Sequence, residues 1–172
     1  VGLLALSLQR TETPKPQIPV SVAKTTLALL APRSSALQNE VGSFSSDVVI
    51  NTEDQSVTAV QLELSYDPLS LTDLDIEPGP FIKSPIVLLK NIDGKNGKVS
   101  YALGVPLGQK GVSGQSVVAT LSFSKNKTTG TSTISFDPKT EVSAEGIAQS
   151  VLKSATGVVF DLSTLFSSPS AK

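Results

Sequence analysis

Apolar and polar residues alternate with a period of two in short runs along the middle of this chain. The clearest run spans residues 57–66 and ends at Asp67-Pro68, where proline has no N–H to donate to a strand. Such alternation is typical of a β-strand with one buried face, because successive side chains point to opposite sides. The run therefore predicts one buried and one exposed face, formed by Val60, Leu62, Leu64 and Tyr66 and by Gln61, Glu63 and Ser65, respectively.

Eight further runs have strand-like composition and are separated by Gly, Pro, Asn and Asp. They cover residues 25–30, 44–52, 71–76, 86–89, 98–104, 116–124, 131–137 and 157–162. Residues 141–154 show little alternation, and only a short turn near 34–38 has helical character. About nine short strands without an amphipathic helix predict an all-β fold, a two-sheet β-sandwich. One shared core is expected, comprising Val60, Leu62, Leu64, Val99, Tyr101, Leu103, Leu121, Phe123, Ile134 and Phe136.

The two ends differ from this body. Residues 1–8 are mostly apolar, but a spanning helix needs about 20 residues. The run fits the end of a membrane anchor or signal segment, the alternative being a loosely docked tail. Three prolines in residues 11–19 favour an extended spacer. We expect an anchor or signal end at 1–10, a Pro-rich linker at 11–23, one β-sandwich domain at 24–163 and a tail at 164–172.

Composition removes several classes of function. The sequence contains no His and no Cys, which excludes Ser-His-Asp and Cys-His catalysis and the usual zinc ligands. Fourteen Lys and Arg stand against fifteen Asp and Glu, with no basic stripe to neutralise a phosphate backbone. Nucleic acid is therefore not expected as a partner. Hydrophobic residues at 39% and charged residues at 17% indicate a globular domain.

Several segments also match a known pattern in order and spacing. The first half is carried by Glu40-Val41-Gly42-Ser43-Phe44, Val48-Val49-Ile50-Asn51-Thr52 and the strand that ends in Tyr66-Asp67-Pro68. The second half is carried by Gly97-Lys98-Val99-Ser100-Tyr101-Ala102-Leu103-Gly104, Ala119-Thr120-Leu121-Ser122-Phe123, Val142-Ser143-Ala144-Glu145-Gly146, Val151-Leu152 and Gly157-Val158-Val159-Phe160. Over residues 25–162 the chain thus resembles the cohesin domain family.

This resemblance implies a nine-stranded jelly roll. Because the sequence lacks His, Cys and a catalytic carboxylate pair, we expect no enzyme activity and no cofactor. Cohesins bind dockerins, which are calcium-loaded modules of polysaccharide-degrading enzymes, and assemble those enzymes on scaffolds or cell surfaces. The chain lacks the duplicated calcium loops of a dockerin, so it would be the receptor. The resemblance implies an extracellular or cell-surface location, and the apolar run at residues 1–8 would allow membrane anchoring. The family shares its superfamily with cellulose-binding modules, so a carbohydrate-binding module is the alternative function.

One face of two strands suits a protein partner. Ser100, Ala102 and Gly104 are small and would leave a flat surface, and the resemblance implies that dockerin-binding strands correspond to these. The neighbouring polar positions Gln61, Glu63 and Ser65 would add hydrogen-bonding groups. An ordinary solvated sheet face explains the same pattern and stays open. Polysaccharide is the less favoured ligand, because Trp is absent and both tyrosines, Tyr66 and Tyr101, fall on apolar faces.

Two acidic segments contain residue types that could bind calcium or act in catalysis. Asp73, Asp75 and Glu77 alternate along one strand, as a calcium site or a glycosidase acid/base pair would require. The inward positions of Leu74 and Ile76 explain this alternation as a solvated face. Residues 91–97 have Lys95 at a ligand-like position and no downstream Glu, so a hairpin turn is expected rather than a calcium loop. The sequence predicts no catalytic residue and no metal site.

Overall fold

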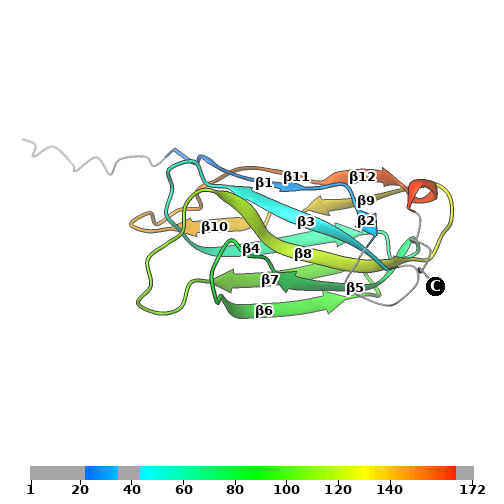
Figure 1. Cartoon of the computed structure of the whole chain (residues 1–172), viewed down its shortest axis with the longest axis horizontal. Helices are drawn as coiled ribbons and strands as arrows, with labels where there is room; N and C mark the ends of the chain where they lie inside the picture. The colour runs from blue at the N-terminus through cyan, green and yellow to red at the C-terminus, as the bar shows by residue number, and fades with distance from the viewer. Residues whose placement is uncertain (1–21, 35–42, 166–172) are drawn as a thin grey trace, which may run out of the picture.

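The computed structural model describes residues 22–34 and 43–165 and is all-β within them (Figure 1). The predicted anchor at 1–10, most of the linker at 11–23, residues 35–38 of the predicted turn and most of the tail at 164–172 lie outside these residues. The strands are β1 (Thr25–Leu29), β2 (Arg33–Ser34), β3 (Ser43–Asn51), β4 (Val57–Tyr66), β5 (Leu71–Pro78), β6 (Ile86–Asp93), β7 (Lys98–Gly104), β8 (Gln115–Lys125), β9 (Thr131–Phe136), β10 (Glu141–Ala144), β11 (Leu152–Thr156) and β12 (Val158–Asp161). A 3-10 turn, Leu162–Thr164, follows β12.

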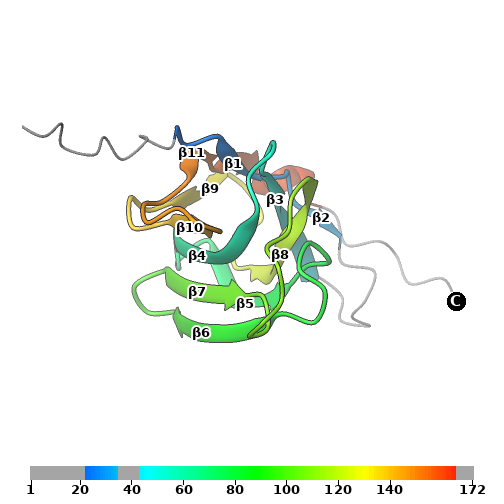
Figure 2. The same ribbon diagram turned by 90° about the vertical axis from the view of Figure 1, so that its left-hand side faces the viewer.

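These strands form two sheets of six strands each. The first sheet has the order β11-β1-β3-β8-β5, with β2 paired to β3. The second has the order β12-β9-β4-β7-β6, with β10 paired to β4. Neighbours are antiparallel except for β1 and β11, which are parallel. Figure 2 shows the two sheets packed face to face, which confirms the predicted two-sheet sandwich.

The core lies between the sheets and follows the predicted alternation. Opposite pairs on β4 and β7, such as Leu62 with Tyr101 and Leu64 with Val99, point inward together. The predicted core residues gather in one cluster, and all are buried except Phe136, which is partly buried against it. Aromatic rings from β3, β8 and β12 meet there. The ring centroid of Phe123 lies 6.3 Å from that of Phe44 and 6.0 Å from that of Phe160. The strand periodicity thus identified the inward face correctly.

The structure contains three strands that were not predicted, β2, β10 and β11. The predicted strands did not include residues 141–154, which show little alternation, but β10 lies there and β11 begins at Leu152. β10 has only four residues, with Val142 and Ala144 buried, and its backbone is held by pairing with β4. β11 is an edge strand whose side chains do not alternate in burial. Both strands exist through long-range pairing, which a local hydrophobic pattern does not reveal.

The predicted hairpin turn between β6 and β7 is confirmed. The backbone N–H of Asn96 donates to the Asp93 carboxylate at 3.1 Å, and Gly97 has φ of +63°. A Cβ atom at Gly97 would lie 2.1 Å from the carbonyl oxygen of Tyr66, so only glycine fits against β4 here. This close approach sets β7 beside β4 and so builds the surface described next.

Within the residues that the structure describes, no helix has the length and apolar character needed to cross a membrane.

Candidate functional site on the outer face of β4 and β7

The antiparallel register of β4 and β7 brings the two predicted rows of site residues together. Gln61 lies opposite Ala102, and Glu63 lies opposite Ser100. Directly opposite residues of an antiparallel pair share one face of the sheet. Their inward neighbours are buried in the core, so this shared face points to solvent.

Glu63 is a charged residue of this surface whose carboxylate is held by its neighbours. The Gln61 side-chain amide donates to Oε1 of Glu63 at 2.9 Å, and the Ser100 hydroxyl donates to Oε2 at 2.6 Å. The Glu63 backbone N–H donates to the Thr140 hydroxyl at 3.1 Å. Both carboxylate oxygens are therefore oriented by hydrogen bonds before any partner arrives. A preorganised polar group of this kind loses less conformational entropy on binding than a freely rotating one.

Ser65 belongs to a second polar group at the same surface. Its hydroxyl donates to Oδ1 of Asp137 at 2.9 Å, and the Lys98 ammonium lies 2.9 Å from Oδ2. Hydrogen bonding from Lys98, and then from Ser65, lowers the pKa of Asp137, so this carboxylate stays ionised. Sequence reasoning missed both Asp137 and Lys98. Lys98 shares the alternation of Ser100 and could have been found from it, whereas only the fold brings Asp137 to Ser65.

The prediction that Gly104 belongs to the exposed surface needs correction. It was expected to extend the flat strip of small residues, but it is buried. A Cβ atom there would lie 3.1 Å from the Thr58 carbonyl oxygen and 3.6 Å from Cδ1 of Leu88. The flat strip therefore ends at Ala102, and Leu88 of β6 lies beside the position of Gly104.

Sequence reasoning also missed an exposed apolar patch on β6, formed by Ile86, Leu88 and Leu89. Ile86 pairs with Gly104 and Leu89 pairs with Ala102, so both face outward with the candidate site. A register shift between Val87 and Leu89 leaves Leu88 on the same side. The three side chains are 45%, 64% and 42% exposed. The available signal was the unbroken apolar run at 86–89, which departs from period-two alternation.

The tyrosines occupy the interior, as the sequence predicted. Tyr101 is fully buried and Tyr66 is 8% exposed. Burial is the main cause that raises the pKa of both hydroxyls. Among the described residues, no aromatic ring lies open on the surface, since Phe136 is itself only partly exposed. The platform on which a sugar ring would stack is therefore missing from the described surface.

The acidic residues of β5 have a structural partner instead of a catalytic arrangement. The Lys90 ammonium of β6 lies 2.9 Å from Asp75 and 2.5 Å from Glu77, joining the edges of the two sheets. Burial favours the neutral form of Asp75, but hydrogen bonds from Lys90 and from the Ile76 N–H hold its pKa below the ordinary value. A glycosidase acid needs the opposite shift. In residues 22–34 and 43–165, no three His, Cys, Asp or Glu side chains group as a metal site.

We predict that the purified protein releases no sugar from soluble or insoluble polysaccharides, because Asp75 is ionised and paired with Lys90. A reducing-sugar assay on the parent chain and on Asp73→Asn and Asp75→Asn variants should give equal, background rates. Turnover that either substitution abolishes would contradict this expectation.

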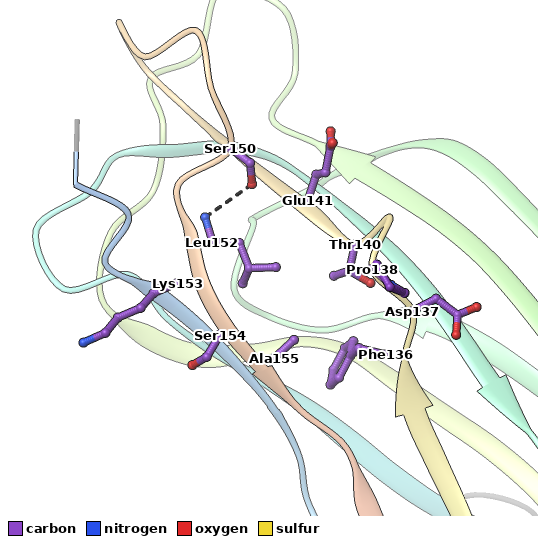
Figure 3. Close-up of a pocket in the computed structure, with 10 residues that line it drawn as sticks. All are labelled: Phe136, Asp137, Pro138, Thr140, Glu141, Ser150, Leu152, Lys153, Ser154 and Ala155. Atoms are coloured by element: carbon purple, nitrogen blue, oxygen red, sulfur yellow. Dashed lines mark hydrogen bonds between the residues drawn. The ribbon is translucent and has the colours of Figure 1, made fainter. Parts of the chain in front are cut away.

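A cleft of about 430 Å³ lies on the side of the sandwich, between the segment from β9 to β10 and strand β11 (Figure 3). Phe136, Leu152 and Ala155 are among its lining residues, and the Ser150 hydroxyl accepts a hydrogen bond from the Leu152 N–H at 3.3 Å. Asp137 and Glu141 stand at its rim with their carboxylates directed away from it (Figure 3). None of the predicted site residues lines this cleft.

A two-sheet sandwich whose candidate site is an open sheet face defines a class, the β-sandwich binding modules. Comparison with known families then identifies the family within this class. The cohesin domain model matches residues 35–159, which is most of the chain. The chain therefore belongs to the cohesin domain family, whose members are non-catalytic protein-binding modules.

Solved cohesin structures share the fold at low sequence identity. A non-cellulosomal cohesin of Archaeoglobus fulgidus is 17% identical with a TM-score of 0.60, over 81% of this chain and 91% of that one. The third ScaC cohesin of Acetivibrio cellulolyticus, solved with the ScaB dockerin, is 15% identical with a TM-score of 0.63, over 80% and 98%. The CaCohA2 domain of Clostridium acetobutylicum is 23% identical with a TM-score of 0.57, over 85% and 93%. No curated protein sequence matches the chain.

Proposed function

We propose that this chain is a receptor module that holds a dockerin-type protein partner on the outer face of β4 and β7. The observation that carries this proposal is the combination of small Ala102 with the fixed polar groups of Gln61, Glu63 and Ser100 on one solvent-facing surface. Shape complementarity and hydrogen bonding, rather than catalysis, are what such a surface offers. Ser65 extends it toward Asp137, and Gly104 contributes by making room for Leu88.

The known behaviour of similar proteins supports the dockerin as partner. The ScaC cohesin of A. cellulolyticus and the OlpC cohesin of Clostridium thermocellum were both solved as complexes with dockerins. The same likeness supports a role outside the cell or at its surface, where the protein would assemble polysaccharide-degrading enzymes. Residues 24–163 would form the binding domain, and 1–10 would serve as an anchor or signal end.

Binding to calcium-loaded recombinant dockerin modules, measured by isothermal titration calorimetry, tests this function directly. Modules encoded in the same genome are the natural panel, with sedimentation against insoluble cellulose run in parallel. We expect at least one dockerin to bind in a 1:1 ratio and cellulose to leave the protein in solution, because the described surface lacks an open aromatic ring. Cellulose binding without dockerin binding would favour the carbohydrate-binding alternative.

A further inference from the structure

The apolar patch of Ile86, Leu88 and Leu89 continues the candidate binding surface. Leu89 pairs with Ala102, which itself pairs with Gln61, so these three side chains form one row across three strands. Adjacent strands lie about 4.8 Å apart, which places Leu89 within about 10 Å of Gln61 between Cα atoms. Exposed neighbouring apolar side chains, rimmed by polar residues, mark interaction sites on soluble proteins.

The opposite end of this surface is acidic. Glu141 of β10 pairs with Gln61, which extends the same row on the other side, and Glu63 lies two residues along β4. Among the described residues, no ion pair forms with Glu63 or Glu141. Lys98 is already paired with Asp137 at 2.9 Å. Lys153 lines the same side cleft as Glu141, but the two side chains point in different directions (Figure 3).

Four carboxylates, of Glu63, Glu141, Asp137 and Asp93, stand on or beside this surface. The ammonium groups there are those of Lys98, which pairs with Asp93 across β6 and β7, and of exposed Lys139 in the turn before β10. The local charge is about −2, whereas the whole chain has a formal charge of only −1. Glu63 is half-buried, and its oxygens accept from neutral donors, Gln61 and Ser100. Charge complementarity across an interface selects partners and excludes those of like charge.

The surface thus has an apolar part on β6 and an acidic part on β4 and β10. We propose that the partner presents apolar side chains to Ile86, Leu88 and Leu89. It presents lysine or arginine to Glu63 and Glu141. The inference builds on the proposed function and specifies which dockerin-type modules the surface accepts. A dockerin whose contact surface is basic beside an apolar corner binds, and one with an acidic contact surface is rejected.

The test uses the dockerin that binds the parent chain most tightly, titrated by calorimetry in 50 mM and 500 mM NaCl. Glu63→Gln should weaken its binding about 10-fold in low salt, and Glu141→Gln about threefold, because the first carboxylate is less exposed. The double variant should lose most of the salt dependence. Glu53→Gln is the matched control, because Glu53 is exposed in the turn before β4, and it should change the affinity less than about twofold.

Leu88→Ser tests the apolar half and should weaken binding about 10-fold while the thermal midpoint of unfolding stays near that of the parent. Binding that is independent of salt and unchanged by Glu63→Gln would overturn the inference, as would tighter binding after neutralisation. A further variant, Ala102→Arg, adds bulk at the middle of the surface and separates the two proposals. If it blocks the interaction while Glu63→Gln has no effect, the proposed function holds and only this inference is wrong. If no dockerin binds the parent chain, both the proposed function and this inference are wrong.

Discussion

Replacing Ala102 by arginine is expected to abolish dockerin binding while leaving the fold intact. Ala102 lies at the centre of the candidate surface, between Gln61 on β4 and Leu89 on β6. Its side chain is half-buried on the outer face, so an arginine there can extend into solvent without entering the core. The added side chain holds an approaching partner away from the sheet, and loss of close fit is enough to prevent specific association.

Calorimetric titration with the best dockerin of the panel measures this effect. We expect at least about a 100-fold loss of affinity, or about 2.7 kcal/mol. The free energy of unfolding should change by no more than about 0.5 kcal/mol, as for most surface substitutions. Thr156→Arg adds the same side chain to an exposed position on β11, in the other sheet, and should bind like the parent. Full binding by Ala102→Arg would show that the partner uses another face.

Replacing Leu62 by alanine is expected to have the largest effect on stability. Leu62 is fully buried, pairs with Tyr101 across β4 and β7, and packs in the cluster between the sheets. Removing three carbons from such a site loses transfer free energy and leaves a cavity that the surrounding strands fill only in part. The expected cost is about 2 to 5 kcal/mol.

Urea unfolding followed by circular dichroism measures this cost through the shift in midpoint at constant slope. Thr133→Ala on β9 is a suitable control, because Thr133 is exposed on the same sheet. It should change stability by less than about 0.5 kcal/mol. A neutral result for Leu62→Ala would contradict the register of β4 on β7.

Together, the two substitutions separate the roles of the two faces of β4 and β7. Leu62 and its inward neighbours stabilise the sandwich, whereas Ala102 and Glu63 stand on the side open to a partner. Because side chains alternate along each strand, a substitution on one face leaves the other nearly unchanged. Binding and stability can therefore be measured independently on this scaffold.

The hydrophobic pattern was enough to assign residues to the interior of the sandwich. The alternation in residues 57–66 and 98–104 assigned Leu62 and Tyr101 to the core and Glu63 and Ser100 to the outer face. It succeeded because the two-residue period of a strand is a local property, fixed by backbone geometry. The order and spacing of these runs also sufficed to indicate the cohesin family.

Contacts between the outer residues, in contrast, depend on the three-dimensional fold. The hydrogen bond from Ser100 to Glu63 spans 37 residues and the one from Ser65 to Asp137 spans 72, so both depend on strand order and register. The bulge in β6 placed Leu88 beside Gly104, although simple alternation would have set Leu88 and Leu89 on opposite faces. Lys90 likewise reaches Asp75 and Glu77 only because the edges of two sheets meet. Pairing, register and bulges arise from contacts between distant segments, so a local hydrophobic pattern does not predict them.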